Sequence, residues 1–76
     1  MAASTLRRVL IDIGVRPDVF TSDPSQDEAY VLVDEGGWCV FYSERGQRTN
    51  EQLFDSESDA CEYLLSVIAR DPTTRR

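Results

Sequence analysis

Apolar residues near the amino terminus recur at helical spacing and predict a first helix. They stand at positions i, i+3, i+4 and i+7 of one stripe: Leu6, Val9, Leu10 and Ile13. Ser4 or Thr5 suits the amino-terminal cap of this helix. Gly14 fits the left-handed position that follows a helix, and Pro17 blocks continuation. The pattern therefore predicts a helix that ends at about Ile13.

A second helical stripe lies near the carboxyl terminus. Ser56 with Asp59 three residues later forms a near capping box, Arg70 suits the carboxyl end, and Pro72 stops the helix. The apolar residues between these signals repeat at helical spacing: Cys61, Leu64, Leu65 and Ile68.

Three strands are predicted between the helices, over residues 28–35, 38–43 and 48–54. Glu35-Gly36-Gly37 signals a tight hairpin, and Glu44-Arg45-Gly46-Gln47 signals a second turn. The third strand is mostly polar, which is typical of a sheet edge. Residues 18–27 are rich in turn formers and predict a loop, with Val19 and Phe20 packed on the core.

The first hairpin has two registers, with either Glu35-Gly36 or Gly36-Gly37 as a two-residue turn. Both leave the same side chains on each face of the sheet. The first face carries Ala29, Val31, Val33, Trp38, Val40 and Tyr42, and the second carries Tyr30, Leu32, Cys39 and Phe41. Both faces are apolar, so we expect one to pack on helices and the other to be covered by a loop or left open for a partner.

These elements predict an α+β domain of order α-β-β-β-α. The simplest architecture is a three-stranded antiparallel meander with both helices packed on one face. Seventy-six residues make one small domain, 1–76, in which residues 1–3 and 72–76 are expected to be flexible.

The chain is acidic in a way that excludes some partners. Its net charge is −6, it has no Lys, and residues 17–69 hold twelve Asp and Glu against two Arg. Phosphate contacts need clustered cationic side chains, so direct nucleic-acid binding is not expected. No apolar span or targeting segment is visible, which predicts no membrane contact and a cytoplasmic protein. Cys39 and Cys61 are then reduced, buried apolar residues.

The sequence also lacks the usual marks of an enzyme. It has no His, no glycine-rich phosphate loop and no nucleophile elbow, and its cysteines have no metal-ligand spacing. We therefore expect no catalysis, no metal and no cofactor. The element order matches that of double-stranded-RNA-binding domains, but these need basic residues where this chain has Asp55-Ser56-Glu57-Ser58-Asp59.

Recognition of a protein remains. Trp38 and Tyr42 share strand parity and are either interface anchors or core residues. Glu44 and Arg45 lie in a turn that is either a contact or simply solvated. Asp55, Glu57 and Asp59 suit the helix dipole as well as a binding patch, whereas Glu62, one turn further on, favours the patch.

The stretch from Trp38 to Leu65 resembles small immunity proteins of bacterial polymorphic-toxin and contact-dependent growth inhibition systems. The similarity lies in Tyr42-Ser43-Glu44-Arg45-Gly46, a polar strand that ends at Phe54, the acidic helix start at 55–59, and Ala60-Cys61-Glu62-Tyr63-Leu64-Leu65. The resemblance implies a cytosolic protein that binds a cognate toxin and blocks it. It does not indicate which residues touch the toxin.

Charge and resemblance together predict a non-catalytic inhibitor of a toxin with a basic surface, for which a nuclease is one candidate. The candidate contacts are Asp34, Glu35, Glu44, Arg45, Glu57, Asp59 and Glu62, with Trp38 and Tyr42 as anchors. One alternative is an acidic adaptor or nucleic-acid mimic that binds another basic protein. Another is a structural subunit that pairs through its second sheet face; a monomer or weak dimer is expected.

Overall fold

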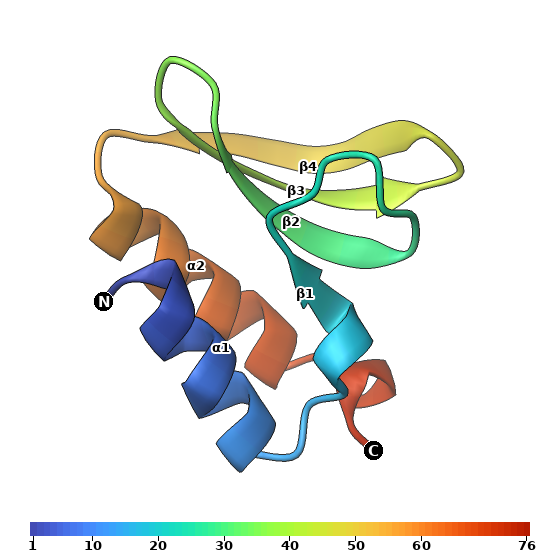
Figure 1. The fold of residues 1–76 in the computed structure, drawn as a ribbon. Helices are drawn as coiled ribbons and strands as arrows, with labels where there is room; N and C mark the ends of the chain where they lie inside the picture. Colours follow the sequence, from blue (N-terminus) through green and yellow to red (C-terminus); the bar gives the residue numbers. More distant parts are fainter.

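A computed structural model describes residues 1–76 as two helices on one side of a four-stranded sheet (Figure 1). The elements are α1 (Ala3–Asp12), the 3₁₀ turn η1 (Pro17–Val19), β1 (Phe20–Thr21), β2 (Ala29–Asp34), β3 (Trp38–Glu44), β4 (Gln47–Phe54), α2 (Glu57–Ala69) and the 3₁₀ turn η2 (Pro72–Thr74). None of the helices combines the length and apolar character that crossing a bilayer requires.

The sheet corrects the predicted three-stranded meander. Strands β2, β3 and β4 are antiparallel neighbours as expected, and β4 is an edge. A fourth strand, β1, pairs in parallel with β2 through Phe20 and Thr21, so the sheet is mixed. β1 has only two residues inside a segment of turn formers, so no strand periodicity marks it in the sequence. Val19 and Phe20 are buried, as predicted.

The register of the first hairpin is also corrected. Asp34 pairs with Trp38, so the turn holds three residues, Glu35 to Gly37, instead of two. This one-residue difference exchanges the two faces of one strand relative to the other. Tyr30 and Tyr42 are therefore cross-strand partners on the side of the helices, and Val31 pairs with Phe41 on the opposite, outer face.

The two faces of the sheet have separate apolar clusters. The main core joins the helices to the inner face and contains Leu6, Leu10, Val15, Val19, Phe20, Leu32, Val40, Ala60, Cys61, Leu64 and Ile68. The outer face carries a smaller cluster of Val31, Cys39 and Phe41, with Val33 packed against it. Both cysteines are free and buried, which confirms the prediction for their side chains.

The ends of α1 show one confirmed signal and one wrong prediction. Gly14 has φ +94°, its N–H donates to Ile11 O, and Val15 N–H donates to Leu10 O, which is a Schellman ending. The cap residue is Ala2 instead of Ser4 or Thr5, and no local side chain caps the helix. Glu57, from the start of α2, accepts the Ala3 N–H at 3.0 Å and supplies that bond from a distance.

Both chain ends are attached to the helices. The Met1 ammonium donates to Ser58 Oγ at 2.8 Å. Residues 72–76 contain η2 and pair with the segment after α1, because Arg16 N–H donates to Thr74 O and Arg76 N–H to Gly14 O. Arg75 donates to the carbonyl of Ala69 at 3.0 Å and so satisfies the end of α2.

Candidate functional site

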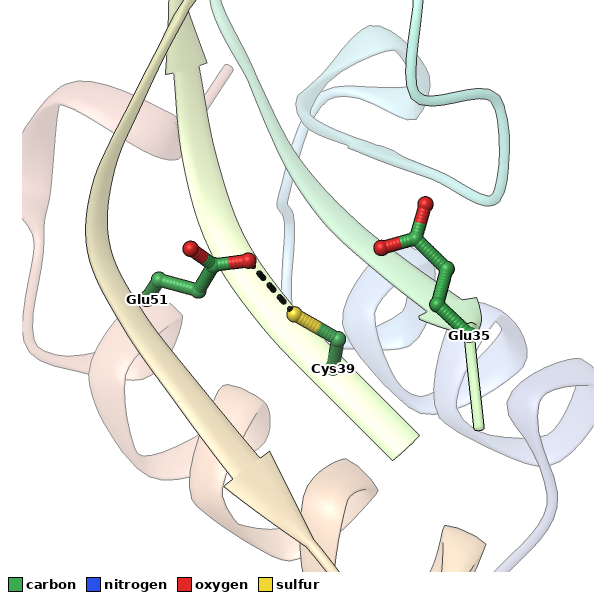
Figure 2. A group of neighbouring side chains, drawn as sticks. All are labelled: Glu35, Cys39 and Glu51. Carbon is green, nitrogen blue, oxygen red and sulfur yellow. Dashed lines mark hydrogen bonds between the residues drawn. The ribbon is translucent and has the colours of Figure 1, made fainter. Parts of the chain in front are cut away.

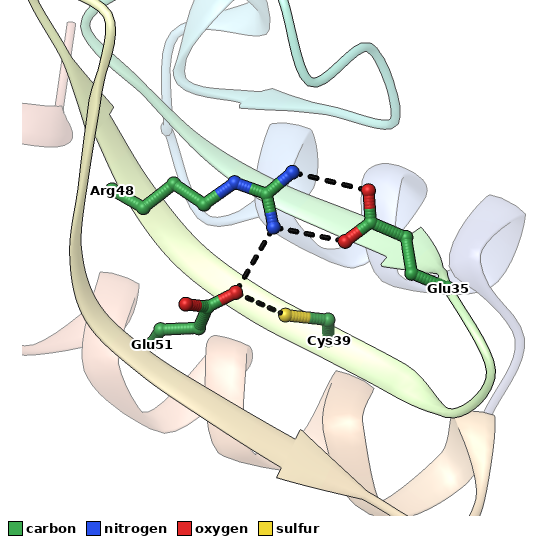
Figure 3. Close-up of polar contacts among 4 residues, drawn as sticks. All are labelled: Glu35, Cys39, Arg48 and Glu51. Carbon is green, nitrogen blue, oxygen red and sulfur yellow. Dashed lines mark hydrogen bonds and ion pairs between the residues drawn. The ribbon is translucent and has the colours of Figure 1, made fainter.

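A β-bulge in β4 places two charged side chains on the outer face. The β3–β4 register shifts between Val40 and Tyr42, and Asn50 at this point has φ +54°. Residues three apart in a regular strand point to opposite faces, but one extra residue restores a common face. Arg48 and Glu51 therefore both lie over the outer face, where Figure 3 shows them together with Glu35.

Arg48 joins the two carboxylates in one network. It donates to both oxygens of Glu35, at 2.8 and 3.0 Å, and to Glu51 Oε2 at 2.9 Å. Its guanidinium carbon lies 4.2 Å from the centre of the Phe41 ring, a cation–π contact. Hydrogen bonding to Arg48 lowers the pKa of Glu35, and bonds from Cys39 and then Arg48 lower the pKa of Glu51. The network covers the apolar outer cluster.

Glu35, Cys39 and Glu51 are close enough to resemble a metal site, with ligand atoms all within 4.8 Å (Figure 2). The Cys39 thiol donates to Glu51 Oε2 at 2.9 Å. Burial, and then this bond to a carboxylate, raise the pKa of Cys39 to about 11, so the thiolate that a metal needs is disfavoured. Since Arg48 already pairs with both carboxylates, the arrangement fits an ion-pair network better than a cation site.

A groove opens on the inner face, between the sheet and the second half of α2. Figure 1 shows that α2 and the β3–β4 hairpin diverge away from the end where α2 begins. The groove has a volume of about 230 Å³, and its walls include Tyr30, Tyr42, Tyr63, Val67 and Asp71. Tyr30 and Tyr42 meet edge to face, with ring centroids 4.9 Å apart. The groove is therefore aromatic, with a carboxylate at its margin.

The polar groups of the groove are negatively charged or neutral. The Tyr30 hydroxyl donates to Asp71 Oδ2 at 3.1 Å. Burial, and then this bond, raise the pKa of Tyr30 to about 12. Burial also raises the pKa of Tyr42, followed by the negative fields of Glu28, Glu44 and Asp71. Hydrogen bonds from Thr73 lower the pKa of Asp71, which keeps its carboxylate charged.

The acidic residues at the start of α2 differ in their roles. Glu57 is partly buried and caps α1, so it supports the fold. Asp59 and Glu62 are exposed, and neither lies within ion-pair distance of an arginine. Across the whole chain, only Asp18, Glu35 and Glu51 have such a partner. The arginines therefore leave Asp59 and Glu62 unpaired, although the Met1 ammonium lies nearby on Ser58.

The candidate contacts fall into two separate groups. Asp34, Glu35, Glu57 and Asp59 lie toward the end where the β2–β3 turn and the start of α2 are found (Figure 1). Trp38 is also at this end, where it is partly buried and packs against the main core.

The second group is at the opposite end of the hairpin strands. Tyr42 lines the groove, and Glu44 and Arg45 are exposed around the β3–β4 turn. Arg45 and Gly46 have φ +52° and +77°, a two-residue hairpin turn.

Sequence reasoning missed Tyr30, Tyr63 and Asp71 as site residues. A two-residue turn in the first hairpin predicts Tyr30 on the face opposite Tyr42. A three-residue turn through Glu35-Gly36-Gly37 pairs Tyr30 with Tyr42. The number of residues in this turn is therefore the sequence signal that could have placed Tyr30 beside Tyr42.

Comparison of the chain with protein-family models, curated proteins and solved structures finds no match.

Proposed function

We propose that this protein is a non-catalytic binding protein that captures a basic protein, and that the partner is a cognate toxin which it neutralises in the cytoplasm. The observation that carries the proposal is the lack of internal compensation for its acidic groups. The net charge is −6, and only three of the fourteen acidic side chains pair with an arginine. Such a surface attracts a cationic partner and speeds its capture.

The distribution of these charges supports contact over an extended surface. Asp59 and Glu62 are exposed at the start of α2, and Glu44 is exposed at the other end, beside the groove. Tyrosine at a partly open surface is typical of interface anchors, since it adds apolar area and a hydroxyl. Tyr42 is therefore the preferred anchor, because Trp38 packs against the core.

Pairing of two copies through the outer sheet face is less well supported. Arg48, Glu35 and Glu51 cover the apolar cluster there, and only Leu53 is a large exposed apolar residue on this face, at 69% exposure. A charged network over an apolar cluster disfavours burial of that face in a dimer.

The test is co-expression with the protein encoded directly upstream in the native host. If that protein is toxic, wild-type chain is expected to restore growth. The double variant Asp59→Lys with Glu62→Lys is expected to slow association and weaken its salt dependence. Glu57 is left unchanged because it caps α1.

The matched control is Asp12→Lys with Asp18→Lys, which makes the same change in net charge at exposed positions near the end of α1 and in η1. It is expected to affect association less than the Asp59/Glu62 variant. Equal effects would contradict a localised surface, and failure of wild-type chain to bind or protect would contradict the toxin proposal. Binding without protection would favour an acidic adaptor instead.

A further inference from the structure

The groove has the chemical groups that bind an organic cation. Three tyrosine rings, from β2, β3 and α2, line it together with Asp71. Aromatic faces carry negative potential, and a guanidinium or ammonium group over such a ring is attracted to it. Asp71 adds a full negative charge at the margin of the groove.

Asp71 retains capacity to accept another hydrogen bond. Its Oδ1 accepts from the Thr73 N–H and hydroxyl, at 3.0 and 2.7 Å, and its Oδ2 accepts only from Tyr30, at 3.1 Å. A carboxylate offers about four lone-pair sites, so one remains on the oxygen that faces Tyr30. A donor in the groove can therefore reach a charged acceptor beside an aromatic wall.

The surrounding field also favours a cation. Glu28, Glu44 and Asp71 all act on Tyr42 with negative charge. Arg16 opposes this field with a smaller effect, and it pairs with Asp18 and does not line the groove. No arginine of the chain is among the lining residues.

The outer face of the same sheet shows which cation suits such a setting. There, aromatic Phe41 and two carboxylates surround the guanidinium of Arg48. Arg7 lies over Phe20 in a similar way, 5.1 Å from the ring centre. Guanidinium is planar, weakly hydrated and able to stack on a ring while it donates to a carboxylate.

From these observations we infer that the groove between Tyr30, Tyr42, Tyr63 and Asp71 receives an arginine side chain of the basic protein partner. Its volume of about 230 Å³ lies below the roughly 300–1,000 Å³ of pockets for whole small-molecule ligands, and suits one side chain. The inference rests on the proposed function, because it identifies how the same acidic protein holds its partner.

The probe is the tripeptide acetyl-Gly-Arg-Gly-amide, titrated into the full chain and followed by NMR. The control peptide replaces arginine by citrulline, which has nearly the same shape without the charge. We expect saturable shifts of groove residues with the arginine peptide, and at least fivefold weaker binding of the citrulline peptide.

Two variants locate the site. Asp71→Asn removes the charge and keeps one oxygen that accepts from Thr73, while its amide NH2 takes the place of the oxygen that accepts from Tyr30. Tyr42→Leu keeps an apolar side chain but removes the ring. Each is expected to weaken arginine binding about threefold to tenfold. The control is Asp55→Asn, which removes a carboxylate just before α2 begins, whereas Asp71 lies just after α2 ends. Circular dichroism checks that each variant is folded.

Equal binding of the two peptides would overturn the inference, and so would shifts confined to Asp59 and Glu62. Either result would leave the proposed capture of a basic protein intact, because that proposal is tested separately by growth protection. If the wild-type chain binds the arginine peptide normally but does not protect against the toxin, the toxin proposal is contradicted and the assignment of the groove as an arginine site is retained.

Discussion

The outer face of the sheet and the groove on its inner face both combine aromatic rings with carboxylates, but only the outer face also holds an arginine of the chain. On the outer face, Phe41 and the carboxylates of Glu35 and Glu51 surround the chain's own Arg48. In the groove, Tyr42 and its neighbours stand beside Asp71 without an arginine of the chain. The first arrangement is completed within the chain, and under our proposal the second is completed by a partner.

The sequence contains a reason for this division. Arg48 and Glu51 reach the outer face together because Asn50 adds a residue to β4 in a left-handed conformation. The same bulge interrupts the regular pattern of an exposed edge strand, which hinders pairing with another chain. One irregular position therefore both brings Arg48 and Glu51 together on the outer face and protects the sheet edge.

The largest expected effect is a difference in stability loss between substitutions of Phe41 and Tyr42, which are neighbours in β3. Phe41→Ala should reduce the free energy of unfolding by about 3–5 kcal/mol, because Phe41 is buried in the outer cluster. That loss is comparable to the whole stability expected for a core of this size, roughly 3–5 kcal/mol. Tyr42→Ala should cost only about 1 kcal/mol, since its ring borders an open groove. Urea denaturation followed by circular dichroism measures both, and equal losses would remove the distinction.

A smaller effect tests the bulge. Asn50→Val should lower stability by about 1–2 kcal/mol, because a β-branched residue is strained at φ +54°. Asn50→Gly is the matched control, since glycine adopts this conformation freely and should stay within about 0.5 kcal/mol of wild type. If both variants are equally stable, Asn50 does not set the position of Arg48 and Glu51. The readout is the urea midpoint of each variant.

The ion pairs of the outer face should make the stability of the protein sensitive to acid. Glu35 and Glu51 have pKa values below the ordinary 4.5 in the folded chain, so their stabilisation is present above that pH and is lost as pH falls. Arg48→Met removes the guanidinium from both carboxylates. Its urea midpoint should therefore fall less than that of wild type between about pH 5 and pH 3. Parallel profiles would show that the network contributes nothing.

The smallest expected effect concerns the groove at alkaline pH. The pKa of Tyr30 is raised from 10.0 to about 12, so the stability it contributes is present below pH 10 and is lost as pH rises toward 12. Asp71→Asn should lower the pKa of Tyr30 only part of the way, because burial is the larger cause. Ultraviolet titration of the wild type and of Tyr30→Phe identifies the signal of Tyr30. If the pKa of Tyr30 is the same in Asp71→Asn as in the wild type, Asp71 does not act on the Tyr30 hydroxyl.

Much of the fold was predictable because its signals are local. The helical stripe and Ser56 cap of α2, the Gly14 ending of α1 and the Arg45-Gly46 turn all depend on neighbouring residues, and all are confirmed. The cap of α1 was missed because Glu57 supplies it from a position distant in sequence. Strand β1 was missed because two residues are too few to show a period.

The site was less predictable, because a one-residue error in the length of a turn assigns the side chains of a strand to the wrong face of the sheet. Gly36 and Gly37 allow several turn lengths, and the wrong length separated Tyr30 from Tyr42. Asp71 follows the last helix, and no pattern in the sequence links it to Tyr30. Only the folded chain brings it to Tyr30. Charge composition, in contrast, survives any error of register, so the acidic surface was visible in the sequence.

The most direct measurement is an isotope-filtered NOE experiment on the labelled chain with unlabelled arginine tripeptide. The account predicts contacts between the arginine side chain and the rings of Tyr42 and Tyr63. It predicts none to the ring of Phe41, which faces Arg48 on the outer face. Contacts to the Phe41 ring, or contacts only to residues at the start of α2, would contradict the assignment of the groove as the place where a cation binds.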